Sequence, residues 1–171
     1  MPIPRDHPAA LDAARLQAEC DTTRTRRSGP GGQNRNKVET AIVLVHRPTG
    51  LVAEASERRS QAENLRAALF RLRVNLALEV RRPIEPGVLP SPLWRSRCRN
   101  EAIGVRPDHD DFPAILAEAL DAIEAQADDL KAASAWLGCT PTQLVKLLKV
   151  EPRALMRLNE RRRRSGLRPL L

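Results

Sequence analysis

The sequence is organised around one loop-forming stretch, which reads Ser28-Gly29-Pro30-Gly31-Gly32-Gln33-Asn34-Arg35-Asn36-Lys37. Three glycines and a proline crowd its first five positions. Both residue types are unfavourable inside helices and strands, and glycine also lets another molecule approach the backbone closely. The stretch is therefore predicted to be an exposed loop that presents backbone N–H groups.

Cationic side chains stand on both sides of this loop. They are Arg24, Arg26 and Arg27 before it, and Arg35 and Lys37 after it. Gln33 lies between the two groups and carries both a donor and an acceptor on its side chain. The pattern suits a polyanion with a reactive end; the alternative is a solvated surface turn. The P-loop signature and the dinucleotide-binding glycine fingerprint are both absent from the sequence.

The segments around the loop predict a small α+β unit in the order β-α-β-β-α. We expect strands over residues 22–27, 41–47 and 51–55, with a brief helical turn at 36–40. A short helix is expected at 8–19. A long helix is expected from about residue 58 to 81, capped by Ser56 and Glu57. Its apolar stripe is Leu65, Leu69, Leu72, Leu76 and Val80.

Three motifs in this order resemble the catalytic domain of the class I peptide chain release factors. They are the Gly-Gly-Gln loop, the turn His46-Arg47-Pro48-Thr49-Gly50, and the helix start Arg59-Ser60-Gln61 with Asn64. The resemblance covers about residues 20–81 and implies the same α+β fold. It also implies hydrolysis of the ester that joins a nascent peptide to tRNA, with the ribosome (large-subunit rRNA) and peptidyl-tRNA as partners.

The resemblance assigns the catalytic role to Gly31, Gly32 and Gln33. The backbone N–H of Gln33 would stabilise the charge that develops during ester cleavage, while its side chain admits and orients water. Neither a cofactor nor a metal is implied. The resemblance further implies that a glutamine methyltransferase modifies Gln33. The candidate RNA or ribosome contacts are Arg24, Arg26, Arg27, Arg35, Asn36, Lys37, Arg58, Arg59, Arg161, Arg162, Arg163 and Arg164.

Charge and proline content divide the chain into three predicted parts. Residues 1–82 form the catalytic domain and hold 15 Lys/Arg against 9 Asp/Glu. Residues 83–108 are a proline-rich linker and irregular segment. Residues 109–171 form an all-α, basic C-terminal domain with helices at 110–125, 128–137, 140–149 and 152–164. Residues 131–171 hold 10 Lys/Arg against 2 Asp/Glu, which suits a polyanionic partner.

Part of the C-terminal segment resembles a helix-turn-helix unit. It runs from Ala132 to Leu144, with Gly138 in the turn and Thr140-Pro141 at the start of the next helix. The structural alternative is an ordinary pair of short helices joined by a glycine turn. The run Arg161 to Arg164 and the nearby cations favour RNA or ribosome contact over packing alone.

Other site classes find no support in the sequence. The three cysteines are far apart and form no Cys-x-x-Cys pair, so neither a disulfide framework nor a zinc site is expected. His46 is expected to close its strand and bond near Thr49 rather than act as a base. No membrane segment or signal peptide is expected, and the chain is predicted to be a cytoplasmic monomer.

Because 27 residues precede Ser28, we expect no room for a codon-reading domain before the loop. The leading hypothesis is therefore codon-independent hydrolysis of peptidyl-tRNA on stalled ribosomes. One alternative is the same hydrolysis on split large subunits. Another is a non-enzymatic nucleic-acid-binding protein that uses the helix-turn-helix-like segment.

Overall fold

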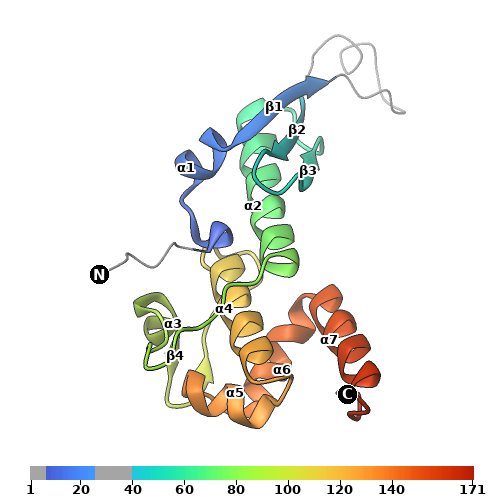
Figure 1. The fold of residues 1–171 in the computed structure, drawn as a ribbon. Helices are drawn as coiled ribbons and strands as arrows, with labels where there is room; N and C mark the ends of the chain where they lie inside the picture. Colours follow the sequence, from blue (N-terminus) through green and yellow to red (C-terminus); the bar gives the residue numbers. More distant parts are fainter. Residues whose placement is uncertain (1–6, 26–39) are drawn as a thin grey trace. The chain divides into compact units, whose positions relative to one another are not determined.

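The computed structural model describes residues 7–25 and 40–171 (Figure 1). Within these residues the chain is of mixed α and β type, with seven α-helices, a three-stranded antiparallel sheet and a two-stranded hairpin. The chain divides into two compact units, Met1–Leu76 and Ala77–Leu171, here called unit 1 and unit 2. This agrees with the predicted α+β class.

Unit 1 is built on a sheet with the strand order β1-β2-β3, in which Thr25 pairs with Ala41 and Ile42 pairs with Ala55. Its elements are η1 (Pro8–Ala10), α1 (Ala13–Ala18), β1 (Cys20–Thr25), β2 (Ala41–His46), β3 (Val52–Ala55) and α2 (Gln61–Glu79), which continues into unit 2. The expected helix at 8–19 is thus two short pieces. The expected turn at 36–40 lies almost wholly outside the described residues.

The core of unit 1 lies between the sheet and α2. Leu44 of β2 and Leu72 of α2 are fully buried, as is Leu16 of α1. The buried residues of α2 within unit 1 are Asn64, Ala68, Leu69, Leu72, Val74 and Leu76, most of which follow the three- and four-residue spacing of a helix face. The predicted stripe is right at Leu69, Leu72 and Leu76. Leu65 is only half-buried, and Val80 is half-buried and lies just beyond the end of α2.

Helix α2 begins three residues later than predicted. Ser60 accepts a hydrogen bond from the backbone N–H of Glu63 at 3.4 Å, so Ser60 and not Ser56 caps the helix. Residues 56–60 instead form the connection from β3.

Unit 2 is arranged around α4, most of whose residues are buried. Its elements are α3 (Pro92–Arg97), β4 (Cys98–Arg99), β5 (Ala102–Ile103), α4 (Phe112–Ala125), α5 (Leu130–Leu137), α6 (Pro141–Val150) and α7 (Pro152–Arg164). The four predicted C-terminal helices agree with α4 to α7 within about two residues at each end. Gly138, in the left-handed conformation at φ 68°, ends α5.

Two features of residues 83–108 differ from the prediction. Helix α3 begins there, because Ser91 accepts a hydrogen bond from the N–H of Trp94 and Pro92 suits the first turn. The Trp94 side chain is buried, and its Nε1 donates to the carbonyl of Leu137 at 2.7 Å. The β4–β5 hairpin follows, so the segment after residue 82 is not purely helical. Its turn uses Asn100 and Glu101 at positive φ, where a sequence pattern would favour glycine.

The three cysteines are free thiols in the structure. Cys20 and Cys139 are buried in unit 1 and unit 2 respectively, and Cys98 is half-buried. Burial raises the pKa of all three thiols, and that of Cys139 reaches about 12. Among residues 7–25 and 40–171, no helix is long and apolar enough to cross a bilayer, and no cluster of His, Cys, Asp or Glu is arranged to hold a metal ion.

Candidate functional site at the base of the glycine loop

Most of the predicted catalytic loop lies outside the described residues. This applies to Gly31, Gly32 and Gln33, and also to Arg26, Arg27, Arg35, Asn36 and Lys37. Their assigned roles remain predictions. The structure describes the two chain segments from which the loop departs, together with the predicted RNA contacts Arg24, Arg58 and Arg59.

The loop connects two adjacent antiparallel strands. The last residue of β1, Thr25, pairs with the first residue of β2, Ala41. Arg24 is exposed and lies one position before this final pair, opposite Ile42. A side chain at this place stands beside the entry to the loop, as a phosphate contact would require.

Asn64 holds the second end of the loop to the start of α2. Its side chain is fully buried, and its Nδ2 donates to the carbonyl oxygens of Thr40 at 2.6 Å and of Arg58 at 2.9 Å. Its Oδ1 accepts from the N–H of Arg58 at 2.9 Å. One amide therefore joins the residue preceding β2 to the β3–α2 connection. The spacing of Asn64 from Arg59-Ser60-Gln61 at the start of the helix is the signal in the sequence that marks this residue.

Arg58 and Arg59 are both exposed, as an RNA contact needs. The N–H and C=O of Arg58 are both bonded to Asn64, so this residue is fixed in place while its side chain stays outside the core. Among the described cations, Arg24 lies at the end of β1, and Arg58 and Arg59 lie in the connection that Asn64 bonds to Thr40.

Two arginines of α2 have partners within unit 1. Arg71 pairs with Glu57 at 2.6 Å and donates to the carbonyl of Glu54 at 2.7 Å. Its hydrogen bond holds the pKa of Glu57 below the usual range. Arg73 donates through Nε to the carbonyl of Ala9 at 2.9 Å. Long cationic side chains often satisfy nearby backbone carbonyls in this way, and the apolar spacing of a helix does not reveal it.

His46 has the structural role that we predicted. Its ring is 1% exposed, with Nδ1 2.7 Å from Oγ1 of Thr49 and Nε2 3.0 Å from a carboxylate oxygen of Glu19. Both ring nitrogens therefore have partners, and the ring fastens the β2–β3 turn to the end of α1. Gly50 completes this turn at φ 72°.

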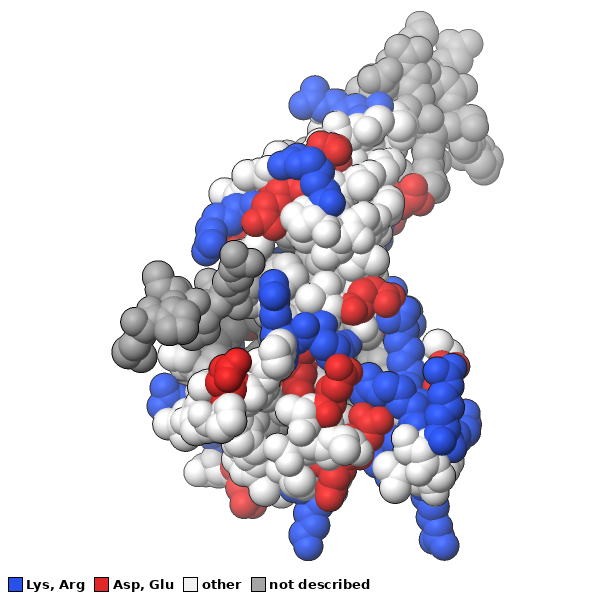
Figure 2. All heavy atoms as spheres, in the orientation of Figure 1, with Lys and Arg blue, Asp and Glu red and all other residues white. Residues whose placement is uncertain are grey.

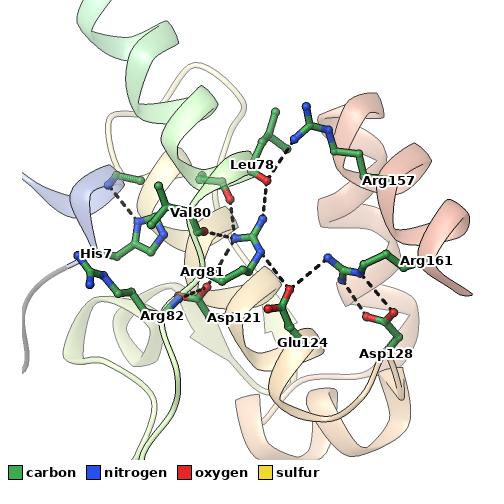
Figure 3. A network of polar contacts seen from close by, with 12 residues as sticks. His7, Leu78, Val80, Arg81, Arg82, Asp121, Glu124, Asp128, Arg157 and Arg161 are labelled. Atoms are coloured by element: carbon green, nitrogen blue, oxygen red, sulfur yellow. Dashed lines mark hydrogen bonds and ion pairs between the residues drawn. The ribbon is translucent and has the colours of Figure 1, made fainter. Parts of the chain in front are cut away.

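The four arginines at the end of α7 divide into two pairs. Arg161 bonds to Asp128 at 2.8 Å and to Glu124 at 3.3 Å (Figure 3). Arg162 donates to two backbone carbonyls, those of Asp128 and Arg168. Arg163 and Arg164 are exposed and make no ion pair with any described residue. The structure thus leaves Arg163 and Arg164 available for a polyanion, while Arg161 and Arg162 stabilise unit 2.

Further arginines of unit 2 belong to the same polar network (Figure 3). Arg81 lies 3.5 Å from Asp121 and 3.6 Å from Glu124. Arg157 pairs with Glu79, and this hydrogen bond lowers the pKa of that carboxyl.

Burial dominates at Asp121, where it raises the pKa from 3.8 to about 6 although Arg81 and the N–H of Arg82 oppose it. On the face shown in Figure 2, basic side chains gather over α7 with acidic ones beside them. A count of arginines along the sequence therefore overstates the charge that is free to bind RNA.

Comparisons with known proteins identify the N-terminal part of the chain. Residues 14–85 match the family model described as the RF-1 domain. Relatives include the chloroplastic peptide chain release factor PrfB1 of Arabidopsis thaliana, 47% identical over 60 residues, which are 35% of this chain and 13% of that protein. Another is the human mitochondrial peptide chain release factor 1, 40% identical over 80 residues, or 47% of this chain and 17% of that protein.

These matches span less than a fifth of the length of either relative. No solved structure gives a significant match. The matched region contains the Gly-Gly-Gln loop, the whole β1–β3 sheet and Asn64, whereas residues 86–171 lie beyond it. Residues 14–85 of this chain therefore match the RF-1 domain and are similar to the corresponding part of peptide chain release factors.

Proposed function

We propose that this protein hydrolyses the ester of peptidyl-tRNA on stalled ribosomes without reading a codon. The observation that carries the proposal is the RF-1 domain at residues 14–85 with an intact Gly31-Gly32-Gln33. Its partners would be large-subunit rRNA and peptidyl-tRNA. Methylation of Gln33 by a glutamine methyltransferase is part of the same proposal.

The proposed hydrolysis uses a backbone N–H donor and does not require an ionisable side chain. Water attacks the ester carbonyl, the carbonyl oxygen gains negative charge, and the bond to the 3′ oxygen of the tRNA breaks as that oxygen takes up a proton. A backbone N–H aimed at the developing charge lowers this barrier, and loss of one such donor typically costs about 10²- to 10³-fold in rate. We assign this donor to Gln33. Gly31 and Gly32 leave room for the tRNA end.

The described residues supply the support that such a loop needs. The β1–β2 pair fixes one side of the loop, and the buried amide of Asn64 bonds the carbonyl of Thr40 on the other side. A group that must meet a reacting carbonyl benefits from a fixed base, because misplacement by about 1 Å costs about 100-fold in rate.

Recruitment without a codon is supported by the chemistry of unit 2. Its exposed cations, among them Arg163 and Arg164, suit phosphates. Contacts to phosphates position a protein on RNA but carry no sequence information. A unit of this kind would recognise a state of the ribosome rather than a codon.

The test is release of labelled peptide from ribosomes stalled on truncated mRNA, with Gln33→Ala and Gly32→Ala compared to the wild-type chain. Gln17→Ala is the matched control, since Gln17 is an exposed glutamine on α1. We expect Gly32→Ala to lose about 100-fold in rate, because an added Cβ displaces the backbone donor. Gln33→Ala keeps the backbone N–H and should lose rate only through the missing water-orienting side chain, and the control should be unchanged. Wild-type protein that releases no peptide, or releases it only when a stop codon occupies the decoding site, would refute codon-independent hydrolysis.

A further inference from the structure

Helix α6 presents a polar stripe that no described residue neutralises. Thr142, Lys146 and Lys149 are exposed and lie four and three residues apart, so they share one face of the helix. The sequence of α6 contains no acidic residue, and neither lysine forms an ion pair with a described residue. This contrasts with α7, where Arg153, Arg157 and Arg161 are paired with carboxylates.

A shallow, open hollow of about 130 Å³ with a mixed polar and apolar lining adjoins this stripe. It is lined by Ile103, Val105, Gln143, Lys146, Leu147 and Val150. Lys146 lines the hollow yet remains exposed, which fits an aliphatic stem along the wall with the ammonium group in solvent. Val150 is 41% exposed, so part of this apolar wall is open to water.

One polar group in the hollow is only partly used. The Oε1 of Gln143 accepts a long hydrogen bond from the N–H of Ile103, at 3.4 Å. Its Nε2 has no hydrogen-bond partner among the described residues. The hollow therefore offers apolar contact, one amide donor and a cation at its edge. An amide can bond the edge of an unstacked base and a cation can contact its phosphate, while the aliphatic wall gives apolar contact without an aromatic stacking surface.

The same geometry argues against duplex DNA as the ligand of α6. In a helix-turn-helix protein the first turn of the second helix enters the major groove. Here the β4–β5 hairpin is attached to that turn. The N–H of Thr140 donates to the carbonyl of Glu101 at 3.3 Å, Glu101 forms a bridge with Cys139, and Gln143 accepts from Ile103. The hairpin would obstruct entry of the first turn of α6 into a major groove, whereas the hollow beside it is open to a single strand.

We propose that α6 and the β4–β5 hairpin form a binding site for single-stranded RNA. An unstacked base lies in the hollow against Val150 and Leu147, and the flanking phosphates contact Lys146 and Lys149. The site is separate from the hydrolytic loop. RNA binding by unit 2 therefore does not depend on the function proposed above.

The test measures binding of the full chain to a fluorescein-labelled single-stranded RNA of about 12 nucleotides, within the usual site size of single-strand binders. The charge variant is Lys146→Gln with Lys149→Gln. The matched control is Lys131→Gln with Arg168→Gln, which removes two exposed cations elsewhere in unit 2. Loss of two phosphate contacts should reduce the slope of log K against log salt by about 1.4, and the control should leave it nearly unchanged.

A second comparison isolates the base. An RNA of the same length without bases keeps every phosphate, and we expect the wild-type chain to bind it more weakly than ordinary RNA. Gln143→Leu should weaken binding to ordinary RNA but not to the abasic strand. Equal slopes for the lysine variant and its control would overturn the proposal. Equal affinity for the two RNAs would overturn it as well, and so would tighter binding of duplex DNA than of single-stranded RNA.

Discussion

Replacement of Asn64 by alanine should loosen the base of the loop to which we assign catalysis. The change removes two donated hydrogen bonds and one accepted bond from a fully buried side chain. At about 1 kcal/mol net for each bond, the expected loss is about 3 kcal/mol. The carbonyl of Thr40 and both backbone groups of Arg58 would then need new partners, which adds to this loss rather than reducing it.

Hydrogen exchange read by mass spectrometry is the appropriate assay. Both tryptophans, Trp94 and Trp136, lie in unit 2, so their fluorescence does not report on unit 1. A loss of about 3 kcal/mol corresponds to about a hundredfold faster exchange of β2 amides that exchange through opening of unit 1. Peptide release from stalled ribosomes should fall together with this protection.

The matched control is Asn75→Ala, on the same helix. Asn75 is half-buried and donates to the carbonyl of Val52 at 3.0 Å, so its loss should cost about 1 kcal/mol. If Asn64→Ala exchanged no faster than Asn75→Ala, the amide of Asn64 would not be a principal support of the loop. If the β2 amides lost protection in Asn64→Ala while peptide release stayed unchanged, Asn64 would stabilise unit 1 without positioning the loop. That result would refute the positioning role of Asn64.

Three further changes test unit 2 by urea denaturation with tryptophan fluorescence. Arg161→Gln should cost about 2 kcal/mol, because it breaks two partly exposed ion pairs, while Arg163→Gln should cost less than about 0.5 kcal/mol; equal costs would refute the division of the arginines. Asp121 has a native pKa of about 6 against 3.8 when unfolded, so the native state retains this proton and stability falls as pH rises between these values. Relative to wild type, Asp121→Asn should therefore gain up to about 3 kcal/mol between pH 4 and pH 7, and a flat difference would contradict the assignment. Gly138→Ala should cost about 1 kcal/mol through the positive φ alone, since an added Cβ would meet no atom within 4 Å. Gly104→Ala, at a glycine without positive φ, should be nearly neutral, and equal effects would exclude backbone strain as the cause.

The sequence predicted the elements whose signals are local. A continuous run of β-forming apolar residues indicated β2, and three- and four-residue spacing indicated α2 and the helices of unit 2 to within a few residues. The bond between His46 and Thr49 was predicted correctly, because the two residues are only three positions apart. The RF-1 family was predicted from three short motifs that occur in a fixed order.

The sequence did not reveal partnerships between distant residues. The bond of Trp94 to the carbonyl of Leu137 anchors α3, yet 43 positions separate the two residues. Arg161 and Arg163 are alike in sequence, but only Arg161 lies on the face of α7 that meets Asp128. The β4–β5 hairpin lacks the glycine that usually marks such turns. These features depend on tertiary packing, which local pattern does not encode.

Each unit contains a buried thiol whose rate of alkylation depends on the opening of that unit. Cys20 belongs to unit 1 and Cys139 to unit 2, and both are shielded from reagents while their units remain closed. The thiolate is the reactive form, and the raised pKa of each thiol makes it rarer still in the closed state. The rate at which each cysteine is alkylated would therefore report the opening of its own unit in the unlabelled native chain. Alkylation would then show which unit is protected when the proposed ribosomal partner is added.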